Sequence, residues 1–331
     1  MSARAWTSFA AVSVLWGIPY LFIKVAVEDG MPPAFLAWAR VVLAALVLCA
    51  MAWHRGLFGS LRGRWRWVVV YAVVEISIPF PLIAAGEQHV SSSLAAILIA
   101  AVPLIIAVLA IRFDPEERVH GRRLFGLLMG FTGVIALVGI DVAGRSDELL
   151  GAILILIAAV GYATGPMTLN RNMSDIQPVA MMGASLAVAS VVLTPFALAD
   201  VPSTTPSSEA LASVVVLGLL CTAAAFVLFG GLLLEVGPGR AAVITYVAPV
   251  VAVGLGVAVL GERPGVGAAA GLLLILAGSW LSTDGRLPPG MGAWVERVRS
   301  RRRGGPIRAR AAEPGSGTEF RAPAVRSQPT S

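Results

Sequence analysis

The sequence predicts an all-α polytopic membrane protein in which ten transmembrane helices form two inverted five-helix repeats. Three observations lead to this prediction: an apolar composition, ten apolar runs of membrane-spanning length, and a duplication within the chain. Hydrophobic residues make up 57% of the 331 residues and charged residues only 13%, whereas soluble domains carry about 25% charged residues. The mean hydropathy of +0.83 indicates that lipid surrounds most of the chain.

Ten apolar runs approach the length of about 20 residues that a helix needs to cross about 30 Å of hydrocarbon. The runs are continuously apolar, which predicts helices, because barrel strands would alternate between apolar and polar residues. The fifth and tenth runs are short. The expected spans cover residues 6–27, 33–53, 66–86, 92–112, 122–140, 149–169, 178–198, 211–233, 241–260 and 265–282.

A tandem duplication relates the two halves of the chain. The segments AAILIAAVPLIIAV around Pro103 and AAVITYVAPVVAVG around Pro249 place their prolines 146 residues apart. The expected repeats are residues 6–140 and 147–282. Because each copy holds five helices, an odd number, the second copy enters the membrane from the opposite side, an arrangement typical of transporters with alternating access. The alternative is that duplication only enlarged the bundle.

The placement of arginine predicts that both termini of this multi-pass protein lie in the cytoplasm. With the N-terminus inside, eleven loop arginines fall on the cytoplasmic side and two, Arg145 and Arg263, on the opposite side, as the positive-inside rule requires. Residues 283–331 are rich in arginine and are expected to form a disordered cytoplasmic tail. That tail either touches anionic lipid headgroups or only fixes the topology.

The motifs that the chain lacks narrow the function. The sequence has no G-x-x-x-x-G-K-S/T phosphate loop, so ATP is not expected to drive it directly. Its two cysteines and three histidines have no metal-binding spacing, and neither a cofactor nor a metal is predicted. The expected partners are a small-molecule substrate and the lipid bilayer, not nucleic acid, and a homodimer is an open alternative. A secondary transporter is favoured over an intramembrane enzyme or a membrane sensor or scaffold.

Three ionisable residues lie inside the expected spans: Lys24, Arg40 and Glu75. Burying a charge in hydrocarbon is costly, so each is a candidate for the substrate or ion pathway. Lys24 is about three residues from the end of its span and is either an interface anchor or a pathway residue. Arg40 and Glu75 lie deeper, at depths that differ by about 5 to 7 Å. They could therefore form a structural bridge, or a switch in which Glu75 exchanges Arg40 for a proton or a cationic substrate.

Four further residues are candidates for the pathway. Trp16 and Tyr162 are related by the offset of 146 residues and either line a cavity or simply pack as aromatic side chains. Tyr246 precedes the second repeat's proline and can reach the same cavity. Asn170 takes the place in the second copy that Lys24 has in the first.

Glycine and proline interrupt matching segments of the two copies, a pattern that points to transporter sites. A proline inside a span frees a carbonyl and either forms a hinge or a static kink. The expected hinges or helix breaks are Gly17, Pro19, Pro103, Gly165, Pro166 and Pro249.

The order of these motifs resembles the EamA-type repeat of the drug/metabolite transporter superfamily. Trp16-Gly17 followed by Lys24, Pro32 and Arg40 is similar to the opening of such a repeat, and the run GEQHVSSSLAAILIAAVPLIIAVLA with the following Glu117-Arg118 is similar to its end.

The resemblance covers residues 8–282, with Tyr246 to Arg263 repeating the end of the first copy, and Leu186 standing where the first copy has Arg40. It implies ten helices in inverted repeats and the export or uptake of small metabolites or drugs. The predicted function is a secondary transporter that moves a small metabolite or drug-like solute across the plasma membrane by alternating access. Efflux is the favoured direction, and proton coupling is an open alternative.

Overall fold

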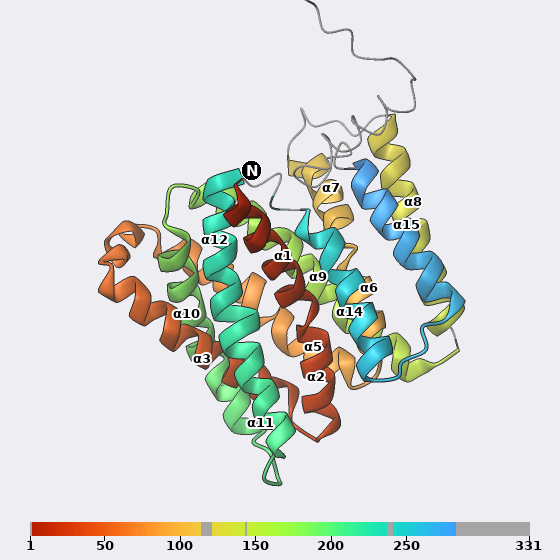
Figure 1. The fold of residues 1–331 in the computed structure, drawn as a ribbon, viewed down its shortest axis with the longest axis horizontal. Coiled ribbons are helices and arrows are strands. Elements are labelled where there is room, and N and C mark those ends of the chain that lie inside the picture. Colours follow the sequence, from red (N-terminus) through yellow and green to blue (C-terminus); the bar gives the residue numbers. More distant parts are fainter. Residues whose placement is uncertain (1, 114–120, 143, 237–240, 242, 283–331) are drawn as a thin grey trace, which may run out of the picture. The chain divides into compact units, whose positions relative to one another are not determined.

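A computed structural model describes residues 2–113, 121–142, 144–236, 241 and 243–282. The chain divides into two compact units, Met1–Gly290 and Met291–Ser331, and every described residue belongs to the first. The predicted tail at 283–331 and the Glu117-Arg118 pair lie outside the described residues. Within these ranges the structure is helical and contains no strand (Figure 1).

Most spans of the first copy are divided into shorter helices, whereas the span Pro33–His54 is continuous. The helices of this copy are α1 (Ala3–Gly17), α2 (Pro19–Glu28), α3 (Pro33–His54), η1 (Leu57–Leu61), α4 (Trp65–Tyr71), η2 (Ala72–Ser77), α5 (Pro79–Glu87), α6 (Ser92–Ile99), α7 (Val102–Phe113), α8 (Arg122–Leu137) and η3 (Val138–Val142). Several start at proline, whose missing N–H has no partner in a first turn anyway. Others start behind a serine cap: the Ser91 hydroxyl accepts from the backbone N–H of Leu94 at 3.2 Å.

The second copy contains α9 (Ser146–Asn172), which at 27 residues is the longest helix in the described ranges. Its other helices are α10 (Pro178–Ala199), α11 (Ser208–Val215), η4 (Val216–Ala224), α12 (Ala225–Val236), α14 (Ile244–Val259) and α15 (Val266–Ser282).

Eight stretches in the described ranges are long and apolar enough to cross a membrane. They are Ala3–Glu28, Pro33–His54, Trp65–Glu87, Ser92–Leu109, Arg122–Val142, Ser146–Leu169, Pro178–Ala199 and Ser208–Val236, and the shorter apolar helices Ile244–Val259 and Val266–Ser282 follow. Ten apolar helical segments therefore stand where the sequence predicts ten spans.

The predicted helix breaks occur in the first copy but not in the second. α1 ends at Gly17 before α2 starts at Pro19. α6 ends at Ile99, the residue whose carbonyl a helical Pro103 would obstruct.

In the second copy, α9 continues through Gly165 and Pro166, so the predicted break there is wrong. Pro249, predicted as a hinge or a kink, also lies inside a continuous helix. Near Pro166, the hydroxyl of Thr164 donates to the carbonyl of Gly161 at 2.9 Å. The carbonyl that Pro166 leaves without an amide donor is that of Tyr162, so this bond is local to the helix and does not replace the missing one.

The third and eighth spans each contain a π-helix at equivalent positions. The offset of 146 residues carries η2 onto residues 218–223, inside η4. In both, a hydroxyl donates to the carbonyl five residues earlier: Ser77 to Ala72 at 3.0 Å and Thr222 to Leu217 at 2.8 Å. π-helical turns occur frequently at functional sites. The two π-helices are therefore candidates for positions that line such a site.

The contacts between the copies come in matching pairs (Figure 1). α3 packs against its counterpart α10, and α8 against its counterpart α15. The contact of α1 with α14 matches that of α9 with α7, and the contact of α3 with η4 matches that of α10 with η2. Glycines bring α8 and α15 together, since a Cβ on Gly126 would lie 2.8 Å from the carbonyl oxygen of Gly278.

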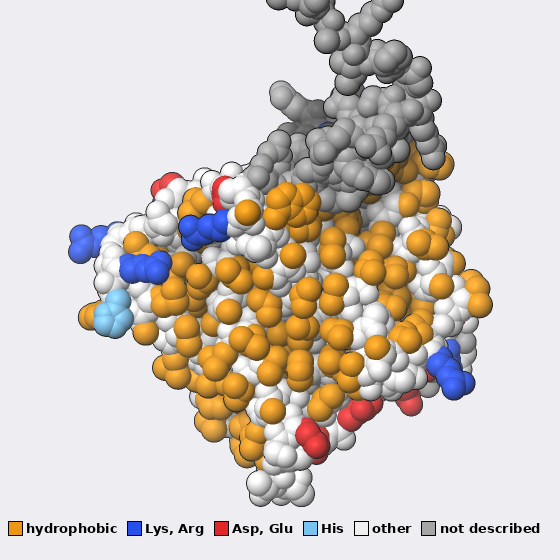
Figure 2. All heavy atoms as spheres, viewed as in Figure 1, with side chains coloured by type: hydrophobic (Ala, Val, Ile, Leu, Met, Phe, Trp, Pro, Cys, Tyr) orange, Lys and Arg blue, Asp and Glu red, His pale blue; other side chains and the backbone are white. Residues whose placement is uncertain are grey.

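The surface of the helices is apolar between two polar ends. Figure 2 shows hydrophobic side chains over most of the viewed face and charged side chains toward its edges. Val191 is 73% exposed, Leu234 73% and Leu273 70%. An apolar surface of this extent marks a site of contact with lipid or another apolar partner, not with water.

Candidate functional site

Arg40 is a buried cation at the contact between the two copies. It lies on α3, is only 7% exposed, and its Nη2 donates a hydrogen bond of 3.2 Å to the Oγ1 of Thr222 on η4. Its guanidinium carbon lies 4.1 Å from the ring centroid of Phe80 on α5. The Nε atom is buried and has no hydrogen-bond partner among the described residues. Since a guanidinium offers five N–H donors, Arg40 keeps donor capacity for a further ligand.

Aromatic side chains enclose this cation. Tyr162 of α9 packs edge-to-face on Phe80 with ring centroids 6.5 Å apart. Both Tyr162 and Tyr20 of α2 lie within electrostatic range of Arg40. We call Tyr20, Arg40, Phe80, Tyr162 and Thr222 the central cluster. It draws one charge and several aromatic faces from α2, α3, α5, α9 and η4, and so combines an apolar lining with a few polar groups, as small-molecule sites do.

Glu75 does not form an ion pair with Arg40 in the described part of the chain. It lies on η2 and faces α9, where a Cβ built on Gly165 would overlap its carboxylate oxygen Oε2. That oxygen is buried and has no hydrogen-bond partner among the described residues. Tyr71 and Tyr162 lie within its electrostatic range. Of the alternatives left open by the sequence, the structural bridge between Arg40 and Glu75 is absent from this conformation.

Gly161 and Gly165 of α9 allow this helix to pack closely against the third span. A Cβ on Gly161 would overlap the carbonyl oxygen of Val74 and lie 2.7 Å from the Cγ of Pro79, and a Cβ on Gly165 would displace Glu75. The sequence pattern that predicted an interrupted helix therefore reflects the near contact of α9 with the π-helix. Glycine has this second use in membrane helices because it lets backbones approach.

Trp16 and Tyr162 lie in different parts of the core. Trp16 packs on Phe229 and Phe226 of α12, with ring centroids 4.6 Å and 5.9 Å apart. Tyr246 belongs to the same apolar cluster as Trp16, and its hydroxyl donates to the carbonyl of Ser279 on α15 at 3.3 Å. The structure thus brings Trp16 and Tyr246 together in one apolar cluster, whereas Tyr162 joins other clusters, one of which includes Phe226. Asn170 lies in α9, but its side chain is outside the described residues.

Lys24 binds the end of a neighbouring helix. Its Nζ donates to the backbone carbonyls of Glu87 at 2.8 Å and Val90 at 3.0 Å and lies 3.3 Å from the carboxylate of Glu28. The side chain is 15% exposed. A cation at the C-terminus of a helix satisfies free carbonyls and interacts well with the helix dipole. Lys24 therefore fastens α2 to the turn between α5 and α6, a role that the sequence analysis did not foresee.

Glu87 is a buried carboxyl group that the sequence analysis missed. It ends α5 and is 0% exposed, and neither carboxylate oxygen has a hydrogen-bond partner among the described residues. The expected third span stopped at residue 86, one residue before it. The available signal was an acidic residue directly continuing an apolar run.

Two further carboxylates, also not predicted, cap helices of the opposite copy. Glu262 of the second copy accepts from the backbone N–H of Ser92 at 2.7 Å and of Ser93 at 3.0 Å, at the start of α6. Asp141 of the first copy accepts from the N–H of Gly267 at 3.2 Å and of Ala268 at 2.6 Å, at the start of α15. Carboxylates are favourable at helix N-termini, so the two copies hold each other at the same end of the bundle.

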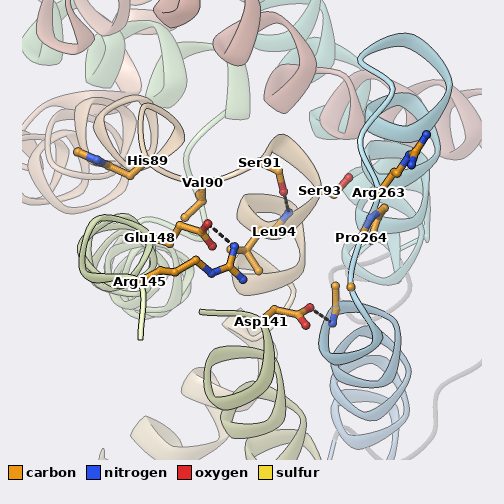
Figure 3. A pocket seen from close by; sticks show the side chains of 12 residues that line it. His89, Val90, Ser91, Ser93, Leu94, Asp141, Arg145, Glu148, Arg263 and Pro264 are labelled. Carbon is orange, nitrogen blue, oxygen red and sulfur yellow. Dashed lines mark hydrogen bonds and ion pairs between the residues drawn. The ribbon is translucent and has the colours of Figure 1, made fainter. Parts of the chain in front are cut away.

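A pocket of about 280 Å³ lies at this end, beside the turn between α5 and α6 (Figure 3). In Figure 3 the ion pair of Arg145 with Glu148 crosses one side of it, and Asp141 reaches to the start of α15. No group of three metal-ligating side chains occurs among the described residues. The residues that line the pocket are His89, Val90, Ser91, Ser93, Leu94, Asp141, Arg145, Glu148, Arg263, Pro264, Gly265 and Ala268.

Comparison with known proteins gives the family. The sequence model of the EamA-like transporter family matches the chain twice, over residues 5–139 and 149–283. A protein of Archaeoglobus fulgidus named "Uncharacterized transporter" is 23% identical over 86% of this chain and 98% of the relative. The "Uncharacterized inner membrane transporter YedA" of Escherichia coli is 30% identical over 76% of this chain and 81% of the relative.

Two further matches complete the comparison. The "Probable amino-acid metabolite efflux pump" of Escherichia coli is 25% identical over 83% of this chain and 93% of the relative. One crystal structure matches with a TM-score of 0.62 and 20% identity over 86% of this chain and 97% of that chain, a likeness of fold alone. The double match, the apolar helices and the named relatives agree: the chain belongs to the EamA-like transporter family of multi-pass membrane transporters.

Proposed function

We propose that this protein is a secondary transporter that moves a small metabolite or drug-like solute out of the cell by alternating access around the central cluster. The observation that carries the proposal is Arg40, a buried cation with one hydrogen bond to Thr222 and an unpartnered Nε among the described residues. A charged group inside a membrane protein typically marks a substrate or ion pathway. The guanidinium supplies a charged donor for a polar group of the solute, and the aromatic rings around it take the apolar part.

The two copies act as inverted repeats in this proposal. Arg40 belongs to the first copy and Thr222 to the second, so a tilt of one copy against the other changes their contact. The matching pairs of helix contacts support an arrangement with approximate two-fold symmetry, and five helices per copy imply opposite orientations. Inverted repeats of this kind open a midplane site alternately to the two sides. The arginine distribution supports cytoplasmic termini.

Efflux is the proposed direction, and Glu75 is the proposed proton carrier. One relative is named a probable amino-acid metabolite efflux pump, which supports outward movement of small polar metabolites. Glu75 supports proton coupling because its buried Oε2 has no partner in the described residues and its neighbours are phenols. A carboxyl in such surroundings is a natural group to take up and release a proton.

An untargeted comparison of metabolites and toxic compounds retained by cells tests this proposal. Cells without the protein should retain one or more solutes that cells with it export. Arg40→Gln should restore retention, whereas Arg55→Gln, a matched change at an exposed loop arginine, should not. Glu75→Gln should remove the dependence of export on the pH gradient. Full export by a folded Arg40→Gln variant would contradict the central role of Arg40, and pH-dependent export by Glu75→Gln would contradict that of Glu75.

A further inference from the structure

Glu87 has a fully buried carboxyl group that no other side chain in the described ranges binds. It is 0% exposed, and both Oε atoms lack a hydrogen-bond partner in the described chain. Lys24 lies nearby, but its Nζ binds the backbone carbonyl of Glu87 instead of the carboxylate. Buried polar groups in native proteins are almost always hydrogen-bonded, and a buried ionised carboxylate without a partner is costly. Because the larger part of this cost belongs to the buried charge, a bound proton lowers it by making the group neutral.

We propose that Glu87 is a proton-binding site of this transporter, loaded from the pocket beside the turn between α5 and α6. Glu87 carries a proton in the conformation described and releases it when that end of the bundle rearranges. The assignment deepens the proposed function, on which its transport consequences rest, by adding to Glu75 a second proton-binding carboxyl group at the end of the bundle that holds the pocket. The occupancy of Glu87 by a proton can be measured without any transport.

A proton fits the surroundings of Glu87 better than a metal cation does. Hard cations such as Mg²⁺ and Ca²⁺ take about six or more oxygen ligands, and no group of three metal-ligating side chains occurs in the described ranges. The backbone oxygens of Glu87 and Val90 already accept from Lys24. A proton needs only one carboxylate oxygen and no further ligands.

The charged and titratable groups around Glu87 come from several elements. Those within its electrostatic range are Lys24 and Glu28 of α2, Arg40 of α3, Glu262 of the loop after α14, and Tyr20 of α2. α9 and η2 also pack against α5, and they contribute Tyr162 and Glu75 to the same interior. Two cations and two carboxylates around Glu87 leave no net charge that would hold it permanently ionised. Its proton can therefore exchange when the contacts of the turn change.

The route to Glu87 starts at the pocket of about 280 Å³. His89 and Val90, the second and third residues after α5 ends at Glu87, line this pocket (Figure 3). Ser93 lines it too and donates its hydroxyl to Glu262. The neighbouring Ser92 hydroxyl is buried and has no partner among the described residues. A carboxylate and two hydroxyls thus lie at the start of α6 beside the pocket, and Glu262 is also within electrostatic range of Glu87.

Glu87 and Glu75 lie at different depths of the same span. They are twelve residues apart, which corresponds to about 18 Å along a helix. Glu87 lies at the end with the pocket and Glu75 within the π-helix. A proton taken up at Glu87 therefore comes from the pocket end and has no need to pass Glu75 first.

Infrared difference spectroscopy on the full chain in liposomes tests the proposal directly. Spectra recorded across a pH series in H₂O and D₂O report protonated carboxyl groups through their C=O stretching band. Wild type should show this band at neutral pH, and Glu87→Gln should lose the intensity of one carboxyl. Glu28→Gln removes an exposed carboxylate beside the same lysine and should leave the band unchanged. An unchanged band in folded Glu87→Gln protein overturns the proposal.

A second variant keeps the proposal testable if Glu87→Gln does not fold. Glu87→Asp keeps a carboxyl group and should move the band without removing it, and a band that neither moves nor weakens also overturns the proposal. In proteoliposomes, a solute flux that varies with pH in wild type should lose that variation in Glu87→Gln while downhill exchange persists. If wild type moves no solute at all, the proposed function fails while the infrared result still decides whether Glu87 binds a proton.

Discussion

Arg40 of the first copy donates a hydrogen bond of 3.2 Å to Thr222 of the second copy. The bond joins α3 to a π-helix and places a charge of one copy against a hydroxyl of the other. Thr222 in turn donates to the carbonyl of Leu217, so the π-helical turn and the cation share one polar group. Any movement of the copies relative to each other has to change this contact.

Thr222→Val should weaken both the transporter and its fold. The change keeps the side-chain shape, removes the acceptor of Arg40, and leaves a buried donor unsatisfied, which costs about 1 to 3 kcal/mol of unfolding free energy. Thermal unfolding in detergent and solute flux in proteoliposomes measure the two effects. Thr132→Val is the matched control, because that exposed threonine bonds only to its own helix and its loss should be nearly neutral. Equal stability of the two variants would contradict the assigned contact.

Gly165→Ala should disturb Glu75. The new Cβ would overlap the Oε2 of Glu75, so either the carboxyl or α9 has to move, at a cost of about 1 to 3 kcal/mol. Gly254→Ala in α14 is the control, because a Cβ there meets nothing within 4 Å and should stabilise the helix by about 0.5 to 1 kcal/mol. Unfolding midpoints that move in the same direction for both variants would count against close packing at Gly165.

Glu262→Gln should loosen the start of α6. The amide loses the charge that interacts with the helix N-terminus and binds Ser92 and Ser93 more weakly, with an expected loss of about 1 to 2 kcal/mol. Glu209→Gln, an exposed change in the first turn of α11, should cost less than about 0.5 kcal/mol. Denaturant or thermal unfolding compares the two. A smaller effect at Glu262 than at Glu209 would show that the cap between the copies contributes little.

Lys24→Met should free the turn between α5 and α6. Methionine keeps the apolar stem but removes the donors to the carbonyls of Glu87 and Val90, so the turn should exchange its amide hydrogens faster. Hydrogen-exchange mass spectrometry on peptides that cover this turn measures the change. Glu28→Gln should have a small effect, because the Glu28 side chain is 60% exposed and water screens its interaction with Lys24. Unchanged exchange in Lys24→Met would refute the fastening role.

The sequence predicts the helical segments well because hydrophobicity sets them locally. The expected span 33–53 becomes Pro33–His54, and 178–198 becomes Pro178–Ala199. The break before Pro103 is predictable for the same reason, since the proline acts on its own helix. Glycine is ambiguous: the pattern at Gly165 fits an interrupted helix and a close helix contact equally, and only the position of Glu75 distinguishes them.

The interior site depends on relations between distant segments that no local pattern encodes. The contact of Arg40 with Thr222 joins residues 182 positions apart, and the matching π-helices leave no signal in composition. Glu87 was missed because the apolar run of the third span ends directly before it and polar residues follow, although the fold buries Glu87 completely. Reciprocal capping by Asp141 and Glu262 likewise appears only when the two copies are packed together.

Solute flux into sealed proteoliposomes, with chemical analysis of the solute on both sides, tests the central claim most directly. The account predicts that wild type moves a small solute across the membrane without changing it chemically. It also predicts that Arg40→Gln abolishes the movement at unchanged folding and that Arg55→Gln leaves it intact. Full flux in folded Arg40→Gln protein, or conversion of the solute without any flux, would contradict the account.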